Sequence, residues 1–375
     1  MTSPFPDLPY WIAFTLVPFV GRMRVGLLEE RFGSLEAAWG ASTGELRAAG
    51  LDARVVSAIA EVRPRIDPHD ELERVRKAGI DVLTWHDPAY PRLLREIDDL
   101  PPVLYVKGEL ADEDRRSVTV VGTRRPTSYG KEVARHLAGD LAKAGVTVVS
   151  GLARGIDGIA HRAALEAGGR TLGVLGSGLD VPYPPEHAGL MRQMAEAGAV
   201  ISEYPLGAKP EARHFPRRNR LLSGLSLGTV VIEAPEGSGT LSTIRSALEQ
   251  NREVFCIPGS IYSPASVITN RLIQEGAKLV MEAEDILEEL NLSAVTPQQG
   301  PLPGLFEAES GDEAALYEAL DFEPQHIDDL SRRTQIPVTR VTGTLAVMEL
   351  KGQVRQVGRL NHIRARDATA RDMRA

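Results

Sequence analysis

The central part of the chain is a series of apolar stretches, most of which end at glycine or proline and are followed by helical periodicity. The stretches are residues 118–122, 146–151, 171–178, 199–205, 229–235, 253–259 and 278–281. Continuous runs of Val, Ile and Leu that alternate with helices are typical of a parallel sheet covered on both faces. The pattern predicts an α/β fold with an extended Rossmann-like, doubly wound, mostly parallel sheet.

The residues before this sheet predict a small helical domain, which we place at residues 1–80. Helical segments are expected at residues 27–32, 34–39, 43–49 and 53–62. Gly33, Gly40 and Gly50 stand where left-handed caps would end the first three. Residues 17–21, a short turn that ends in glycine, resemble a helix-hairpin-helix or SAM-like module, in which such a turn can hold a DNA phosphate. A domain that serves only packing is the alternative. Strands at residues 82–85 and 103–106 then begin the central domain, placed at 81–290.

An acidic segment separates the central domain from the C-terminal residues. Residues 282–313 hold nine acidic side chains and no Lys or Arg, and we place a solvated linker at residues 291–312. Beyond it, helices at 313–320, 327–334 and 338–350 and a β-like run at 354–360 predict a winged-helix-like domain over 313–375. Residues 325–375 carry ten Lys or Arg against five Asp or Glu. This charge fits DNA contact, but such domains equally serve as dimer or protein contacts.

Composition describes a globular chain of several domains. Its 375 residues exceed what one compact core holds, and its net charge of −8 does not by itself indicate a nucleic-acid or membrane partner. The single cysteine, Cys256, excludes an intramolecular disulfide and lies in an apolar run that predicts a core position. The apolar stretch at residues 10–20 is far short of the ~20 residues that span a bilayer. We therefore expect a cytoplasmic protein with no membrane segment.

Glycine-rich loops follow several of the predicted strands. The loops of interest are Gly122-Thr123-Arg124-Arg125, Ser150-Gly151, Gly176-Ser177-Gly178 and Gly237-Ser238-Gly239-Thr240. The ligand crevice of an open parallel sheet lies at the carboxyl ends of its strands, and glycine turns that lead into helices favour anions. Each loop alone has a purely steric explanation, but the four together predict a phosphate-binding rim.

Two common nucleotide-binding motifs are missing from this rim. The first loop lacks G-x-G-x-x-G, no acidic residue ends the second strand, and the chain contains no G-K-[ST]. The histidines show no H-x-x-x-H or H-E-x-x-H pairing. We therefore expect no cofactor and no metal.

The most unusual segment is residues 213–220, which place four arginines, an aromatic ring and an amide within eight positions. Its members are Arg213, Phe215, Arg217, Arg218, Asn219 and Arg220. A basic groove with an exposed ring holds single strands, because the charges follow the phosphates and each stacked base contributes ~1–3 kcal/mol. The alternative is a helix start with solvated arginines and Phe215 in the core. We favour a single-strand site.

Few residues indicate catalysis. Asp157 and His161 are four residues apart, so they share a helix face either as an acid/base pair or, more commonly, as a helix-stabilising pair. Glu233, at the end of the fifth parallel strand, is the best carboxylate for nucleotide hydrolysis. Residues 235–240 approach the P-G-G-x-G-T turn of a group of nucleotide-cleaving Rossmann enzymes, which is the main alternative function. Glu236 argues against it, because its charge faces the place of a phosphate.

The motifs of the central region together resemble the DNA-processing protein A (DprA, or Smf) family. The resemblance covers residues 90–290, with V-G-T-R-x-P-T-x-Y-G at 121–130, S-G-L-A-x-G-I-D at 150–157 and F-P-x-R-N-R at 215–220. It implies a protein that is not an enzyme, binds single-stranded DNA in its Rossmann domain and works as a homodimer. It further implies contacts with RecA and single-strand binding protein, and the protection of incoming DNA and loading of RecA during natural transformation.

The resemblance and the rim together define the expected functional residues. The predicted strand-binding set is Gly122, Thr123, Arg124, Arg125, Ser150, Gly151, Arg213, Phe215, Arg217, Arg218, Asn219, Gly237, Ser238, Gly239 and Thr240. By resemblance, residues 270–279, with Asn270, Ile273 and Leu279, serve self-association and RecA contact. A third hypothesis makes the winged helix the working site, as a binder of double-stranded operators.

Overall fold

The computed structural model describes residues 7–292, 310–321, 324–351, 353–357 and 360–364. The chain divides into two compact units, residues 1–297 and 298–375. Most of the predicted linker at 291–312 lies outside the described residues, and its boundaries, like the one at residue 80, stay predictions.

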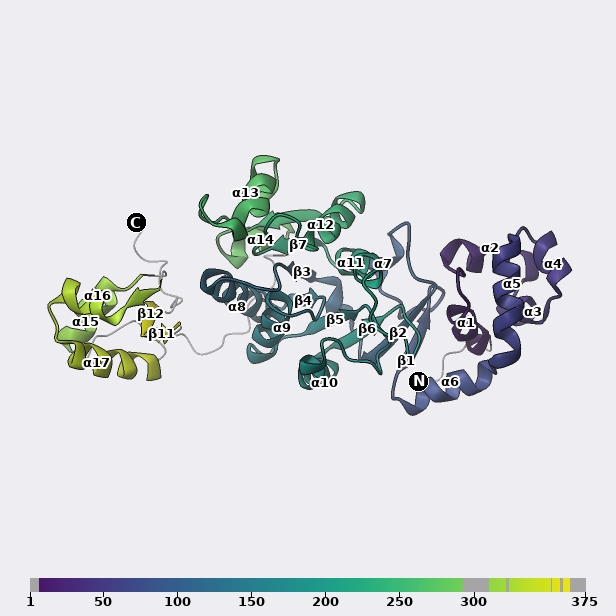
Figure 1. The fold of residues 1–375 in the computed structure, drawn as a ribbon, viewed down its shortest axis with the longest axis horizontal. Coiled ribbons are helices and arrows are strands. Elements are labelled where there is room, and N and C mark those ends of the chain that lie inside the picture. The colour runs from purple at the N-terminus through teal and green to yellow at the C-terminus, as the bar shows by residue number, and fades with distance from the viewer. Residues whose placement is uncertain (1–6, 293–309, 322–323, 352, 358–359, 365–375) are drawn as a thin grey trace. The chain divides into compact units, whose positions relative to one another are not determined.

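A nine-stranded sheet forms the centre of the first unit (Figure 1). Its strands lie in the order β1-β2-β6-β5-β4-β3-β7-β8-β9. Strands β3 to β9 pair in parallel, whereas β1 and β2 are joined antiparallel at one edge. The strands are β1 (Asp81–Thr84), β2 (Val103–Gly108), β3 (Ser117–Val121), β4 (Thr147–Ser150), β5 (Thr171–Leu175), β6 (Ala199–Ser202), β7 (Gly228–Val231), β8 (Glu253–Cys256) and β9 (Lys278–Leu279). Each apolar stretch that predicted a strand contains one, and the predicted Rossmann-like sheet is confirmed.

Helices cover both faces of this sheet, because its inner strands are buried on both sides. One face packs against α8 (Ser128–Lys143), α9 (Ile156–Glu166) and α14 (Ala283–Glu289). The other packs against α7 (Arg92–Arg95), α11 (His214–Gly224), α12 (Thr240–Glu249) and α13 (Val267–Gln274). A further helix, α10 (Ala188–Ala197), packs beside β5 and β6. Figure 1 shows α8 and α9 on one side of the strands and α11 and α12 on the other.

The start of the acidic segment belongs to this domain. Helix α14 buries Ala283 and Ile286 against the face covered by α8, because its apolar residues recur at helical spacing. The acidic residues around them remain on its solvent side. Residues 283–289 therefore form part of the packed domain, although they belong to the acidic segment.

The order of the strands places the loops. The chain moves from β3 through β4 and β5 to β6 on one side, and then returns to add β7, β8 and β9 on the other side of β3. In a doubly wound sheet the binding crevice lies at such a reversal, outside the carboxyl ends of the strands. The predicted glycine loops after β3, β4, β5 and β7 all lie along that edge.

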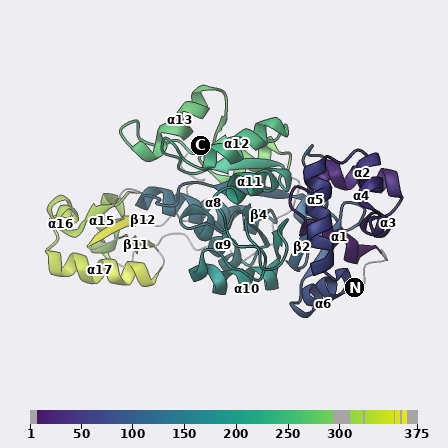
Figure 2. The same ribbon diagram turned by 45° about the vertical axis from the view of Figure 1, so that its right-hand side comes forward.

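Six α-helices precede the sheet among the residues that the structure describes. They are α1 (Leu8–Thr15), α2 (Arg22–Phe32), α3 (Leu35–Gly40), α4 (Thr43–Ala48), α5 (Ala53–Val62) and α6 (Pro68–Lys77). Helix α1 is apolar almost all round and so lacks the amphipathic period by which a helix is predicted from sequence. It contacts β2 (Figure 2), where Thr15 Oγ1 lies 2.8 Å from the Tyr105 hydroxyl. One hydrophobic core runs from these helices into β1 and β2.

The glycines that end these helices differ from one another. Gly33 and Gly50 have φ of 76° and 99°, as expected for left-handed caps. Gly40 was expected to do the same, but it is the last residue of α3, and the chain leaves through an extended Ala41.

In the turn between α1 and α2, Arg24 donates to the Phe19 carbonyl at 2.6 Å. A DNA contact by this turn stays a prediction.

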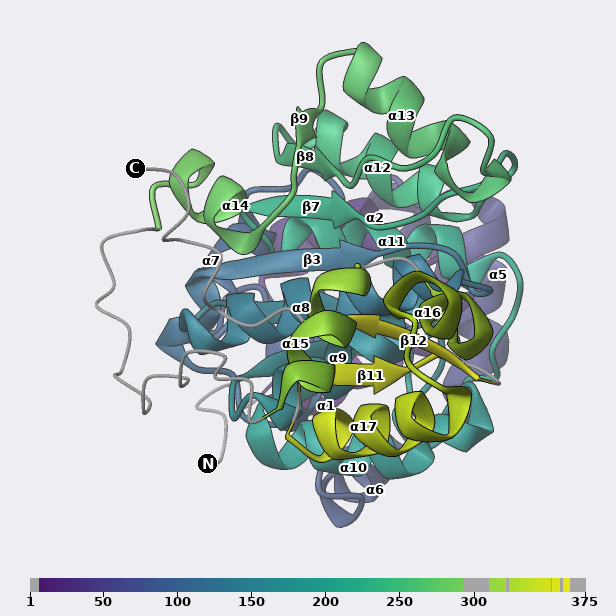
Figure 3. The ribbon, with the colours of Figure 1, turned by 90° about the vertical axis from the view of Figure 1, so that its left-hand side faces the viewer.

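The second unit contains three α-helices and a three-stranded sheet among its described residues. Figure 3 shows the helices α15, α16 and α17 around the strands β11 and β12. Its elements are α15 (Gly311–Ala319), β10 (Gln325–His326), α16 (Ile327–Thr334), α17 (Val338–Leu350), β11 (Val354–Gln356) and β12 (Asn361–Arg364). The helices bury Leu316, Leu330 and Leu345 in a common core, and β11 and β12 form a hairpin. This arrangement confirms the predicted winged helix.

Neither a membrane-spanning helix nor a metal-binding cluster is found in the described part of the chain. None of its helices combines the length and the apolar character needed to cross a membrane. It also contains no group of three or more His, Cys, Asp or Glu side chains arranged to hold a metal ion.

Cys256 is buried in β8, as its apolar neighbours predicted. Burial raises the pKa of its thiol to about 12, so almost none of the reactive thiolate exists near pH 8. We expect Ellman's reagent to leave Cys256 unmodified in the native chain and to titrate one thiol in denaturant. Rapid labelling of the native chain would contradict this position.

Candidate nucleic-acid interface

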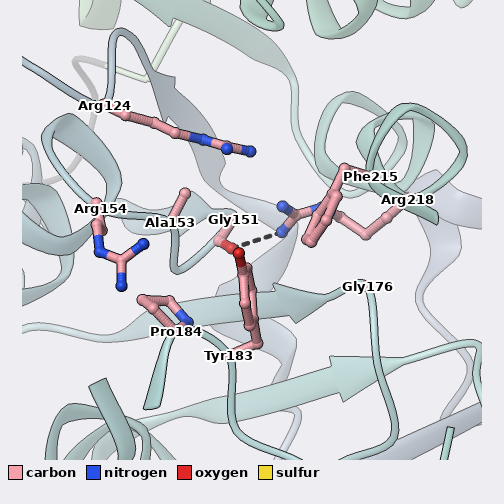
Figure 4. A pocket seen from close by; sticks show the side chains of 9 residues that line it. All are labelled: Arg124, Gly151, Ala153, Arg154, Gly176, Tyr183, Pro184, Phe215 and Arg218. Carbon is pink, nitrogen blue, oxygen red and sulfur yellow. Dashed lines mark hydrogen bonds between the residues drawn. The ribbon is translucent and has the colours of Figure 1, made fainter. Parts of the chain in front are cut away.

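A pocket opens at the carboxyl edge of the sheet (Figure 4). Loops that follow β3, β4 and β5 form it together with the first turns of α11. Its lining consists of Arg124, Gly151, Ala153, Arg154, Gly176, Tyr183, Pro184, Phe215 and Arg218. Of the predicted strand-binding set, the fold therefore brings Arg124, Gly151, Phe215 and Arg218 into one pocket.

Two glycines allow the loops after β3 and β4 to touch. Gly155 has φ of 79°, and a Cβ there would lie 2.4 Å from the Thr123 carbonyl oxygen. A Cβ on Gly122 would lie 2.7 Å from Cγ1 of Ile156. Backbone hydrogen bonds complete the junction, with the Ile156 amide donating to the Thr123 carbonyl at 3.3 Å. This close approach places Arg124 and Arg154 around the same opening.

Aromatic rings form one wall of the pocket. The Phe215 and Tyr183 ring centroids are 5.5 Å apart with 39° between their planes. The Arg124 guanidinium lies 5.7 Å from the Phe215 centroid, a cation–π distance. Gly176 leaves space for the ring, because a Cβ there would lie 3.2 Å from it. Phe215 thus belongs to the pocket wall and is not a core residue.

Arg218 forms the floor of the pocket and is only 4% exposed. Its Nη1 donates to the Gly151 carbonyl at 2.7 Å and to the Val174 carbonyl. The Asp157 carboxylate is also buried there and accepts from the Gly151 amide at 3.1 Å. Burial lowers the pKa of Arg218 to about 10, and the nearby Asp157 carboxylate opposes that change. Arg218 is therefore a fixed cation beneath the opening.

The other arginines of residues 213–220 face different surroundings. Arg213 is exposed and pairs with Glu211 at 2.8 Å. Arg217 and Arg220 both pair with Glu203, at 3.5 and 2.9 Å, and Arg220 is buried. The four arginines of this segment therefore do not line one groove together. Most of the segment is helical, so its side chains point in several directions around the helix, some to solvent and some to the interior.

Arg124 and Arg125 are the rim cations without an acidic partner. Both side chains are exposed, and neither forms an ion pair within the described part of the chain. Arg154, which also lines the pocket, is held by Glu186. Arg124 is therefore exposed, is not neutralised by an acidic side chain of the described residues, and contacts the aromatic wall.

Several predicted strand-binding residues lie outside the pocket lining. The Ser150 hydroxyl is buried and donates to the Val120 carbonyl at 2.6 Å. The Asn219 amide donates to Ser242 Oγ at 2.7 Å, which ties α11 to α12. The loop from Gly237 to Thr240 starts α12, where the Ser238 hydroxyl donates to Thr240 Oγ1 at 2.9 Å. Gly122, Thr123 and Arg125 adjoin the lining residue Arg124 along the chain.

The segment assigned to self-association lies on α13 and β9. The Asn270 side chain bridges both backbone groups of Gly259, at 3.0 and 3.2 Å, and so fixes the preceding loop. Ile273 is half-buried against the core, whereas Leu279 is 40% exposed on the edge strand β9. Leu279 is the member of the three that faces solvent most.

The predicted strand-binding set lacks four residues of the lining, Ala153, Arg154, Tyr183 and Pro184, whereas Gly176 belongs to a glycine loop of the predicted rim. Ala153 and Arg154 lie in a glycine loop that was recognised, but a loop sequence does not show which of its side chains turn towards a pocket. Tyr183 and Pro184 lie eight and nine residues beyond β5. An aromatic residue next to proline was the available signal.

The candidate catalytic groups have structural partners. Glu233 is 1% exposed and accepts from the hydroxyl and the amide of Thr127 at 2.5 and 2.9 Å, which holds the start of α8. The imidazole of His161 is buried, and its Nδ1 lies 2.7 Å from Thr171 Oγ1. Burial lowers the pKa of His161 to about 3, so the ring is neutral at pH 7. His161 and Asp157 bond to different partners, which gives no support to the acid/base hypothesis.

The fold and the pocket define a Rossmann-like protein with a cationic, aromatic site at its sheet edge, joined to a winged helix. The family described as DNA recombination-mediator protein A matches residues 81–291, and the DprA winged helix domain matches residues 300–358. This chain belongs to the DNA recombination-mediator protein A family. The resemblance read from its motifs is confirmed.

Individual relatives are similar over most of their length. Protein Smf of Synechocystis is 40% identical over 305 residues, which cover 79% of this chain and 76% of that protein. DNA processing protein DprA of Bacillus subtilis is 45% identical over 220 residues, covering 58% of this chain and 74% of that one. The X-ray structure of DNA processing protein A from Streptococcus pneumoniae matches with a TM-score of 0.64 and 35% identity. That match covers 75% of this chain and 96% of that one.

A second solved relative concerns DNA directly. This structure is described as giving insights into the single-stranded DNA binding mode of DNA processing protein A from Helicobacter pylori. It matches with a TM-score of 0.52 and 30% identity, covering 57% of this chain and 96% of that one.

Proposed function

We propose that this chain is a recombination mediator that holds single-stranded DNA at the pocket of Figure 4. The observation that carries the proposal is the exposed Arg124 guanidinium, which has no acidic partner in the described residues and lies over the Phe215 ring. The Helicobacter pylori relative, described as binding single-stranded DNA, supports the same ligand.

The geometry suits an unpaired strand. A single strand presents both its phosphates and the faces of its bases, whereas duplex bases are stacked on each other. Arg124 and Arg125 supply charge for phosphates, and Phe215 with Tyr183 supplies ring surface for a base. Arg218 adds positive potential from below without being free to move, because two carbonyl groups hold it.

The partners are part of the same proposal. Family membership supports RecA, single-strand binding protein and a second copy of the chain as partners, with RecA loading and protection of incoming DNA as the outcome. Leu279 and the neighbouring Met281, 40% and 66% exposed beside the edge strand β9, supply apolar surface for self-association. A strand edge with exposed apolar side chains is suited to pairing with another chain.

We propose no catalytic step. Glu233, the carboxylate best suited to nucleotide cleavage by its sequence position, is buried and bonded to Thr127. Release of free base from a nucleoside monophosphate would revive the enzyme hypothesis.

Arg124→Ala and Phe215→Ala are each expected to weaken single-strand binding about tenfold, since each removes a contact of roughly 1–3 kcal/mol. The measurement is fluorescence anisotropy with a labelled oligothymidylate across a salt series. For Arg124→Ala the slope of log affinity against log salt should flatten by about 0.7, the value for one lost phosphate contact.

Arg115→Ala is the matched control. Arg115 is an exposed arginine in the turn before β3, at the amino ends of the strands. This variant should bind as the wild-type chain does. Unchanged affinity in both pocket variants would place the strand elsewhere.

A further inference from the structure

Arg154 lines the pocket, yet its charge is already matched within the chain. Its Nε donates to Oε1 of Glu186 at 2.5 Å. Arg154 belongs to the loop between β4 and α9, and Glu186 to the short turn Pro185–His187, directly after the lining residues Tyr183 and Pro184. Figure 4 shows Arg154 beside Pro184 at the pocket opening.

The Arg154–Glu186 pair lies at the opening of the pocket that we propose holds the DNA strand. The Arg154 and Glu186 side chains are 55% and 49% exposed, so water and solutes reach both. The bond to Glu186 raises the pKa of Arg154, and the bond to Arg154 lowers that of Glu186, so each favours the charged form of the other. A carboxylate and a phosphodiester both offer a guanidinium anionic oxygens, and phosphates are common arginine ligands.

The ion pair between Arg154 and Glu186 is weak enough for a phosphate to take the place of the carboxylate. Exposed ion pairs are weak in water and are screened by salt, in contrast to buried ones. The Arg220–Glu203 pair nearby is buried on both sides and braces α11, so it is not available for exchange. Arg154 and Glu186 can separate without unpacking the core.

We propose that Glu186 is an internal competitor of the DNA backbone, whose carboxylate occupies Arg154 in the free protein and is displaced by a phosphodiester of the bound single strand. This role rests on the proposed function of the pocket. It makes Arg154 a latent phosphate ligand, and it makes the affinity of the chain for single strands lower than its pocket arginines alone would allow.

The test is a double-mutant cycle on Arg154 and Glu186, with affinity for the labelled oligothymidylate measured at low salt. Glu186→Gln should strengthen binding about two- to five-fold, the range that an exposed ion pair gives. The gain should be smaller in the Arg154→Ala background, because no guanidinium remains to be released. Arg154→Ala should correspondingly cost more in the Glu186→Gln background than in the wild-type chain.

Asp112→Asn is the matched control, because Asp112 forms an exposed 2.9 Å pair with Arg115 at the opposite edge of the sheet. It removes the same charge and should leave affinity unchanged. Equal gains from Glu186→Gln with and without Arg154 would show general repulsion and overturn the competitor role alone. Failure of the wild-type chain to bind single strands would overturn the proposed function and this role together.

Discussion

Arg218→Ala is expected to lower the free energy of unfolding by about 3–5 kcal/mol, the cost of removing one partner from a buried charged cluster. The change leaves the Gly151 and Val174 carbonyls without their donor and removes the cation that most strongly opposes the effect of burial on the pKa of Asp157. Urea unfolding followed by circular dichroism measures the loss.

Arg217→Ala controls for the loss of an arginine from α11. Its side chain is 53% exposed, and its partner Glu203 keeps the buried Arg220, so the change should cost no more than about 1 kcal/mol. A loss below about 1 kcal/mol for Arg218→Ala would contradict the buried position of its guanidinium. Because Arg218 supports the fold, a binding defect in Arg218→Ala does not identify it as a DNA ligand, and Arg124 is the better probe.

Gly155→Ala is expected to lower both stability and single-strand affinity. The position has φ of 79°, and the added Cβ would lie 2.4 Å from the Thr123 carbonyl oxygen and 2.7 Å from the carbonyl carbon of Arg124. Backbone atoms cannot turn aside as a flexible side chain does, so the loops after β3 and β4 must separate. Overpacking of this kind costs about 1–3 kcal/mol, and the strained backbone, with ψ of −128° at Gly155, adds about 1–3 kcal/mol for alanine. Arg124 then moves away from Phe215, and affinity should fall about tenfold.

Gly168→Ala separates the two contributions. Gly168 has φ of 73°, but nothing lies within 4 Å of a Cβ placed there. This variant should lose only about 1 kcal/mol of unfolding free energy and should bind the oligonucleotide normally. Comparable binding by Gly155→Ala and Gly168→Ala would show that the junction of the two loops does not position Arg124.

The sequence was most informative where one physical requirement acts on many consecutive residues. A strand buried on both faces must be apolar throughout, so the parallel strands were visible as Val and Ile runs, and their loops followed. The glycines at the ends of those runs were visible for a similar reason, since close approach of two backbones excludes a side chain. Helix α1 was not predicted, because a helix that is buried all round has no amphipathic period in its sequence.

The position of individual charges was decided only in three dimensions. Residues 213–220 contain four arginines in eight positions, yet Arg218 and Arg220 point inwards and Arg213 and Arg217 outwards, which depends on what α11 packs against. The net charge of −8 does not reveal these orientations, because it sums charges that lie far apart in the fold.

The partners of those charges lie far away along the chain. Arg154 meets Glu186 across 32 positions, and Arg218 meets Gly151 across 67. Local periodicity predicted the sheet and its loops, and the segment 213–220 together with the family resemblance predicted the kind of ligand. Tertiary structure decided which cations face that ligand, because the energy of a charge depends on its burial and on the groups that the fold brings beside it.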